Sequence, residues 1–170
     1  MVTYTYLNGK AVRAMRRSDR EITDRAEIVR IIDACDCCRV GFATEDGVYI
    51  VPLNFAFIEN GALGAFYFHG AKEGRKAELI AARPKVGFEM DCAHRLNASD
   101  RACGYSFAYQ SVIGTGVITL VADPEEKKRA LTAIMAHYAP ETAWVFTDGQ
   151  AQAVAVYRLD IESLSCKAHA

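Results

Sequence analysis

Residues 48–58 read Val48-Tyr49-Ile50-Val51-Pro52-Leu53-Asn54-Phe55-Ala56-Phe57-Ile58, an almost continuous apolar run. Turn pairs flank this run, because Asp46-Gly47 precedes it and Asn60-Gly61 follows it, ahead of a second apolar segment at 63–69. Such pairs are typical of hairpin turns, so the pattern predicts a β-meander with buried faces. Proline cannot donate to a strand ladder, so at Pro52 we expect an edge, a bulge or the approach of another group.

The segment before this run predicts a helix and a further strand. Asp24 and Glu27 have the spacing of a capping box, in which Asp24 is the N-cap and Glu27 reaches back. An apolar stripe with helical spacing follows and predicts a helix over 24–35. Its members are Ile28, Ile31, Ile32 and Cys35. Residues 38–44 are short and apolar, which predicts a strand.

The segment after the meander predicts a mixture of strands and helices. A short helix should stop before Pro84, and Gly114 and Gly116 should allow a bend in a long strand. Asp123 followed by Pro124 is the start signal of a last helix. The expected elements are helix 72–82, strand 85–92, a polar loop at 93–103, strand 105–121, helix 124–138 and strand 152–160.

These elements together predict a mainly β protein with flanking helices. Consecutive hairpin signals favour an antiparallel sheet, most simply a small barrel with helices packed outside it. Residues 1–22 are polar and basic, and we expect an N-terminal arm there. Residues 23–170 are expected to form a single domain, since the chain has neither an internal repeat nor a linker rich in Pro, Gly or Ser.

The composition excludes several classes of protein. The chain has 170 residues, 51% of them hydrophobic, and a net charge of −1. That balance argues against disorder and offers no global field for nucleic acid or an anionic membrane. No apolar run approaches the length of a membrane-spanning helix, and the N-terminus lacks the pattern of a secretory signal. We therefore expect a cytoplasmic protein without nucleic-acid or membrane partners.

The six cysteines are interpreted as core residues and exposed thiols. A reducing compartment makes a disulfide framework improbable. Cys35, Cys37 and Cys38 form a Cys-x-Cys-Cys cluster, which is a poor match to the paired spacing of zinc sites, so no metal site is expected.

The segment from Tyr67 to Lys76 carries the clearest chemical signal. It reads Tyr-Phe-His-Gly-Ala-Lys-Glu-Gly-Arg-Lys and passes from a strand into a helix. Gly70 and Gly74 let the backbone approach a ligand, and a helix N-terminus presents free amides and a positive dipole end. Lys72 and Lys76 share one helix face and Arg75 flanks it. The spacing fits a phosphate site, and it equally fits a solvated helix start.

Other polar residues allow more than one interpretation. His69 could hydrogen-bond a ligand or move a proton near neutral pH, or it could cap local backbone. Gln110 and Ser111 lie in a polar strand entry that could meet a ligand, a partner subunit or neither. His94, His137 and His169 lack ligand-spaced partners and are expected at the surface or its boundary.

Four segments in order resemble the pyridoxamine 5′-phosphate oxidase-like flavoproteins, and within these the 5-nitroimidazole resistance branch. They are Met15-Arg16-Arg17-Ser18-Asp19-Arg20-Glu21-Ile22, Val51-Pro52-Leu53-Asn54-Phe55, Tyr67 to Lys76, and Ser111-Val112-Ile113-Gly114-x-Gly116. The resemblance covers about residues 13–167. It implies an FMN-binding split β-barrel that forms a homodimer, with two flavins at the subunit interface.

The resemblance also implies a set of cofactor contacts and one catalytic residue. The Val-Pro-Leu-Asn strand would line the isoalloxazine ring, Lys72 and Lys76 would be the main phosphate cations, and His69 would be the functional histidine near the flavin. Gln110 and Ser111 would reach across from the neighbouring subunit. The full implied set is Val51, Pro52, Leu53, Asn54, Phe55, His69, Gly70, Ala71, Lys72, Arg75, Lys76, Gln110 and Ser111.

The implied activity is that of an FMN-dependent oxidoreductase, acting between a small electron donor and a nitroaromatic or quinone-like acceptor. The family often has Tyr-Arg-Ser where this chain has Tyr109-Gln110-Ser111, which argues against a phosphate role there. The C-terminal arginine-rich motif of the oxidase proper is missing from 163–170, which argues against pyridoxamine phosphate oxidation. The alternative is a non-catalytic flavin or haem carrier on the same barrel, with His137 or His169 as a haem ligand.

Overall fold

The computed structural model describes residues 4–7, 10–13, 17–61 and 63–170. A short strand pair precedes the main body, β1 (Tyr4–Leu7) with β2 (Lys10–Arg13), followed by the 3-10 turn η1 (Ser18–Arg20). The expected arm at 1–22 falls partly outside the described residues. Within it, β3 (Glu21–Ile22) pairs with the last strand of the chain, where Ile22 is opposite Cys166.

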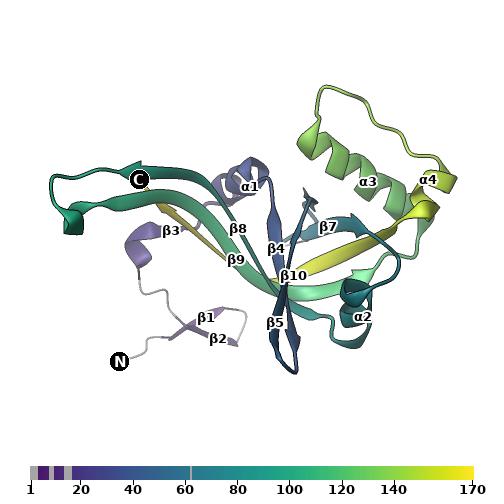
Figure 1. Cartoon of the computed structure of the whole chain (residues 1–170), viewed down its shortest axis with the longest axis horizontal. Coiled ribbons are helices and arrows are strands. Elements are labelled where there is room, and N and C mark those ends of the chain that lie inside the picture. The colour runs from purple at the N-terminus through teal and green to yellow at the C-terminus, as the bar shows by residue number, and fades with distance from the viewer. Residues whose placement is uncertain (1–3, 8–9, 14–16, 62) are drawn as a thin grey trace.

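The main body is one antiparallel sheet flanked by four α-helices, so the predicted fold class is confirmed (Figure 1). Its strand order is β5-β4-β8-β9-β10-β7-β6. The strands are β4 (Cys38–Thr44), β5 (Gly47–Leu53), β6 (Phe55–Ile58), β7 (Ala65–Gly70), β8 (Lys85–Asn97), β9 (Ser106–Leu120) and β10 (Ala155–His169). The helices are α1 (Arg25–Ala34), α2 (Arg75–Ala82), α3 (Pro124–Tyr138) and α4 (Asp148–Ala153), and a 3-10 turn, η2 (Ala102–Gly104), precedes β9.

The run at 48–58 is two strands rather than one. It breaks at Asn54, and the strands on either side, β5 and β6, lie at opposite ends of the strand order. A single residue spans only about 3.5 Å, so the two ends of the sheet must curl toward each other. The result is a barrel that stays open where β5 and β6 do not pair. We call this opening the seam.

Beside the seam, Tyr138 at the end of α3 links the start of β6 to the segment before β4 through two hydrogen bonds. The Phe55 amide, at the start of β6, donates to the Tyr138 hydroxyl at 3.2 Å, and that hydroxyl donates to the Asp36 carbonyl at 2.8 Å. Pro52 is in β5, which among the described strands pairs with β4 alone, so of the three alternatives expected for the proline the edge position is the one observed.

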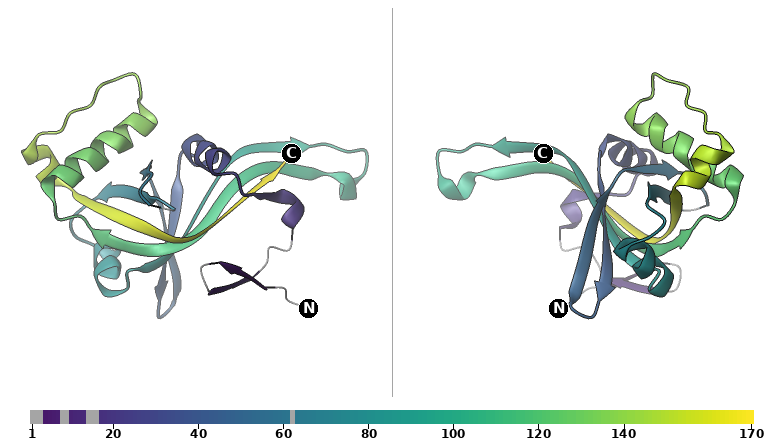
Figure 2. Two further views of the ribbon diagram at one scale, coloured as in Figure 1. Left: turned by 180° about the vertical axis from the view of Figure 1, so that it is seen from behind. Right: turned by 45° about the vertical axis from the view of Figure 1, so that its right-hand side comes forward.

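The hydrophobic core has two parts. The larger part fills the barrel and includes Phe42, Phe55, Phe66 and Phe68, all fully buried. The smaller part lies beneath α3 and α4, where Ala130, Leu131 and Ala151 pack on residues of β7 and β10. Figure 2 shows α3 and α4 at one end of the molecule and the long β8–β9 hairpin projecting at the other.

The helices begin where their capping residues stand. The side chain of Asp24 accepts from the amide of Glu27, as expected. Glu27 does not reach back, because its carboxylate instead binds Arg30 at 2.6 Å. Asp123 caps α3, whose bounds equal the predicted helix 124–138.

Three expected elements have different limits in the structure. Helix α2 begins at Arg75 rather than 72, and β8 continues to Asn97 through the segment expected as a loop, with a bulge around Ala93. The strand expected at 152–160 is β10, which starts after helix α4 and continues to His169. The small helix α4 was not predicted.

The six cysteines carry free thiols, and Cys35, Cys38 and Cys166 are buried while Cys103 is exposed. This matches their interpretation as core residues and exposed thiols. Within the described residues, no helix has the length and apolar character to cross a membrane. The same residues include no group of three or more His, Cys, Asp or Glu side chains placed to hold a metal ion.

The bend of the long strands depends on glycine packing. At Gly114 in β9, an added Cβ would collide with the Ser163 carbonyl of β10 and the Phe88 ring of β8. The register between β9 and β10 shifts close by, between Ile161 and Ser163. The expected bend at Gly114 therefore coincides with a β-bulge in the neighbouring strand, at a point where only hydrogen fits.

We predict that Gly114→Ala lowers the free energy of unfolding by about 2–3 kcal/mol, because the methyl group overpacks the junction of three strands. Urea denaturation measures the change. The matched control is Gly149→Ala, whose added Cβ meets nothing within 4 Å and lies in a helix, so it should be neutral or slightly stabilising. Equal stability of Gly114→Ala and the wild-type protein would show that this junction is not tightly packed.

Candidate functional site

The structure brings the 51–55 and 69–76 segments together at the seam. Phe55 of β6 is opposite Phe68 of β7. Continuing this antiparallel register by one residue places Asn54 next to His69. From the other side of the seam, the Arg75 guanidinium lies over the ring of Tyr49 in β5, 4.4 Å from its centroid. Two segments separated in the sequence therefore border one region.

The start of α2 has the form of an anion site. Asp24, Asp123 and Thr147 cap α1, α3 and α4 with their side chains, whereas Gly74 at the start of α2 supplies no side-chain cap. The first amides of α2 therefore remain available to an acceptor. Gly74 has φ = 105°, a conformation that favours glycine, and this turn delays the helix to Arg75.

Lys76 is the most enclosed cation of the site. Its Nζ donates to the His69 carbonyl at 3.5 Å and lies 5.4 Å from the centroid of the Tyr157 ring. A Cβ on Gly70 would come within 2.5 Å of that Nζ, so the glycine makes room for the amine. Burial lowers the pKa of Lys76 below that of a free lysine.

The positive charges here lack acidic partners. Among the described residues, Lys72, Arg75 and Lys76 form none of the recorded ion pairs, whereas Arg39 and Arg158 are each paired with carboxylates. Lys72 and Arg75 are exposed, and Lys76 is half-buried. An uncompensated cluster beside free helix amides attracts a phosphate group.

His69 stands at the end of β7, next to these cations. Burial, followed by the positive charge of Lys76, lowers the pKa of His69 below the usual histidine value. The imidazole is therefore neutral at pH 7, with a ring nitrogen able to accept a proton or a hydrogen bond. The burial is only partial, because the residue as a whole stays accessible to solvent, so a ligand at the seam could reach it.

Gln110 and Ser111 lie far along β9 from the α2 cations. Leu120 of β9 is opposite Tyr157 of β10, and Tyr157 lies close to the end of β7. Ser111 lies nine residues before Leu120 in β9. At about 3.3 Å per residue this is about 30 Å of strand. The registers therefore separate these two residues from the α2 cations, whereas Ile113, two residues after Ser111, shares a cross-strand row with Pro52 through Arg39 and Glu89.

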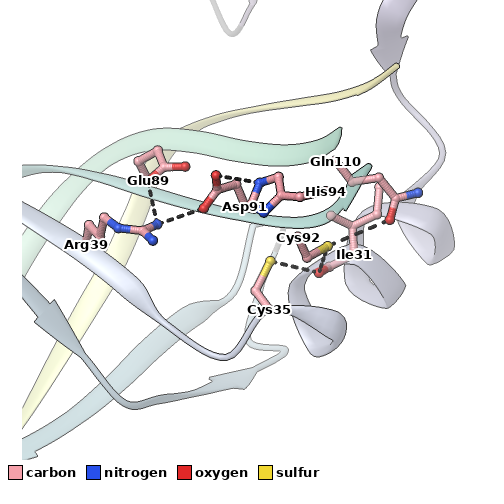
Figure 3. Close-up of polar contacts among 8 residues, drawn as sticks. All are labelled: Ile31, Cys35, Arg39, Glu89, Asp91, Cys92, His94 and Gln110. Carbon is pink, nitrogen blue, oxygen red and sulfur yellow. Dashed lines mark hydrogen bonds and ion pairs between the residues drawn. The ribbon is translucent and has the colours of Figure 1, made fainter. Parts of the chain in front are cut away.

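Gln110 and Ser111 also face opposite sides of the sheet. Ser111 is opposite Asp91 and Gln110 is opposite Cys92, so their side chains alternate. The Cys92 thiol is 3.8 Å from the Gln110 Oε1 and 3.9 Å from the carbonyl of Ile31 (Figure 3). Gln110 is thus directed toward α1, and Ser111 toward the outer face.

A group of charged side chains on β4 and β8 is held together by ion pairs. Arg39 of β4 binds Glu89 at 3.1 Å and Asp91 at 2.8 Å, and His94 binds Asp91 at 2.8 Å (Figure 3). Arg39 therefore has acidic partners, in contrast to the cations of α2. His94, expected in a loop, is on β8.

The two histidines considered as haem ligands are engaged in other contacts. The Nε2 of His137 bonds the Cys35 carbonyl at 2.8 Å, and the Nε2 of His169 is 3.3 Å from Arg20. Sequence reasoning missed a different pair of residues, Tyr49 and Tyr157, whose rings carry the Arg75 and Lys76 cations. A strand pattern gives no signal for this role, because it depends on how α2 packs over the sheet.

Comparison with known proteins gives one family and several structural relatives. The family model described as pyridoxamine 5′-phosphate oxidase matches residues 24–168. A candidate 5-nitroimidazole antibiotic resistance protein from Bacteroides thetaiotaomicron is 30% identical, with a TM-score of 0.74 over 87% of this chain and 86% of that one. A search of the curated proteins gives no match.

Two further structures share the fold at lower identity. The flavocytochrome Anf3 from Azotobacter vinelandii is 20% identical, with a TM-score of 0.73 over 92% of this chain and 72% of that one. The FAD and heme binding protein from Mycobacterium smegmatis is 17% identical, with a TM-score of 0.73 over 88% and 73% of the two chains.

We predict that Lys76→Glu weakens FMN binding by about a hundredfold or more, because it sets a negative charge against the phosphate. Binding of riboflavin, which lacks the phosphate, should change by less than about threefold, and isothermal titration measures both. FMN affinity of the wild-type protein should fall as the pH rises through the lowered pKa of Lys76, since only the ammonium form attracts the phosphate. The control variant is Lys127→Glu in α3, and unchanged FMN affinity in Lys76→Glu would exclude the lysine as the anchor.

Proposed function

Because this chain belongs to the pyridoxamine 5′-phosphate oxidase family, we propose that it is an FMN-dependent oxidoreductase that reduces nitroaromatic or quinone-like acceptors as a homodimer. The observation that carries the proposal is the uncompensated cation cluster at the uncapped start of α2, beside a neutral histidine and the seam. The relative that is 30% identical supports the nitroaromatic class of acceptor.

The residues present fit a flavin mononucleotide. Lys76 and the first amides of α2 would hold the phosphate, with Lys72 and Arg75 adding positive charge around it. Gly70 leaves the space that the lysine amine needs, and a side chain there would displace it. Pro52 and Asn54 border the same region on the other side of the seam, and they would contact the ring system.

The chain's own groups would orient the acceptor and supply a proton. When bound, the flavin supplies the electrons, as a cofactor does in most such enzymes. His69 is neutral at pH 7, so a ring nitrogen would take a proton from solvent and pass it to the reduced acceptor. Burial and then the charge of Lys76 lower the pKa of His69, which would favour transfer of the proton onward.

A second copy of the chain would complete the site. The outer face of the sheet exposes Val48 and Ile50 of β5 and Ile113 of β9, at 68%, 60% and 50% of their surface. The registers place this face together, because Ile50 is opposite Gly41 and Gly41 is opposite Gly87. An exposed apolar face of this kind is typical of a contact surface, and it carries Ser111.

The small molecule released from the purified protein tests the cofactor assignment. Heating should release a yellow compound with the mass of FMN, and the protein should show the absorption bands of an oxidised flavin. An intense Soret band would instead support a haem carrier, and FAD in the supernatant would overturn the choice of FMN. A flavin-loaded protein that cannot reduce any acceptor would support a carrier without turnover.

We predict that His69→Ala keeps its FMN but loses about a hundredfold in acceptor reduction, the size of a typical general-acid contribution. Stopped-flow absorbance measures how fast a nitroaromatic compound reoxidises the dithionite-reduced, FMN-loaded protein without oxygen. His94→Ala is the matched control, because His94 bonds Asp91 in the ion-paired group on β4 and β8. Equal rates for His69→Ala and the wild-type protein would remove His69 from proton transfer.

We predict that Ile50→Lys converts the dimer into a monomer, because it buries a charge in the contact face. Light scattering should give twice the chain mass of 18.7 kDa for the wild-type protein and this mass itself for the variant. The control is Val145→Lys, since Val145 is 85% exposed in the connection between α3 and α4. A dimeric Ile50→Lys would place the interface elsewhere, and a monomeric wild-type protein would refute the dimer.

A further inference from the structure

Tyr157 is a buried residue that touches both halves of the candidate phosphate site. It lies in β10, opposite Phe68 of β7, and only 2% of its surface is exposed. Its hydroxyl donates to the carbonyl of Ala71 at 3.3 Å, and its ring faces the Nζ of Lys76 at 5.4 Å. No other described residue bonds to the carbonyl of Ala71 in the recorded contacts.

The first contact fixes the turn before α2. Residues 71–74 carry no regular structure, and they lead into the helix whose amides are free. The hydroxyl of Tyr157 holds the start of this turn against the sheet. The position of the α2 amides relative to β7 therefore depends on a bond from β10.

The second contact fixes the cation. A lysine ammonium in a partly buried place needs compensation, and a carboxylate would neutralise the charge that an incoming phosphate requires. The face of an aromatic ring stabilises a cation without cancelling its charge. Lys76 contacts the Tyr157 ring and the His69 carbonyl, so these two groups orient its ammonium without a carboxylate.

We propose that Tyr157 is a positioning residue for phosphate recognition, which holds the 71–74 turn through its hydroxyl and Lys76 through its ring. The proposal rests on the proposed function and goes beyond it, because it assigns the selection of a phosphorylated flavin to a residue outside the site itself. Tyr157 acts through Lys76 and the turn, so its effect should be confined to ligands that carry the phosphate.

Two variants separate the two contacts. Tyr157→Phe keeps the ring and loses the hydroxyl, and Tyr157→Leu loses both. Titration calorimetry with FMN and with riboflavin measures the affinity for each ligand at pH 7. We expect FMN to bind about tenfold more weakly to Tyr157→Leu and about threefold more weakly to Tyr157→Phe, with riboflavin unchanged within twofold in both variants.

A double-mutant cycle with Lys76→Met identifies the route of the effect. In the Lys76→Met background, Tyr157→Leu should cost no more FMN affinity than Tyr157→Phe does, because the ring no longer has a cation to hold. The melting temperature of each variant reports folding separately from binding.

The possible failures are distinct. Equal losses for FMN and riboflavin would assign Tyr157 a purely structural role and overturn the proposal, as would a full additional loss in the Lys76→Met background. Unchanged FMN binding in Tyr157→Leu would overturn it as well. A wild-type protein that binds neither ligand would refute the proposed function, and this proposal with it.

Discussion

The single residue between β5 and β6 constrains the whole molecule. Asn54 joins the two ends of the strand order, so the sheet has no freedom to lie flat, and its large aromatic residues are enclosed in a barrel. The same constraint brings the Pro52 edge strand beside the end of β7. The seam is therefore a direct product of the chain path, and it provides the place where a flat ligand could lie between two strands without displacing a ladder.

The positive potential of the site arises because its lysine and arginine side chains have no carboxylate partners among the described ion pairs. In the described part of the chain, most ion-paired arginines have their carboxylate on the same or a neighbouring element. Arg39 with Asp91 is an example. The cations of α2 are instead held by aromatic rings and a backbone carbonyl. This arrangement keeps a positive potential in a protein whose net charge is only −1. Together with burial, the charge of Lys76 lowers the pKa of His69, so the same cation acts on a neighbouring base.

Local patterns predicted most of the fold, because caps, turn pairs and apolar stripes act over a few residues. Helix 124–138 and the edge position of Pro52 are examples. The bulge at Ala93 disrupts the alternation of β8, so its last five residues were expected as a loop. The end of β10 is polar, so its pairing with β9 was not predicted. The six residues of α4 carry no apolar stripe. At the site, the cations were visible in the sequence, but the tyrosine rings that hold them were not, since their role arises only when α2 packs on distant strands.

The β8–β9 hairpin and the connection at Asn54 should differ in how well they tolerate insertions and deletions. The tip of the hairpin is attached at one end only, so insertions or deletions there would leave the barrel intact. A residue added beside Asn54 would lengthen the one-residue connection between β5 and β6 and loosen the closure of the barrel. Related sequences could therefore vary in the length of this hairpin, and so in the surface that it presents, while keeping the same closed barrel.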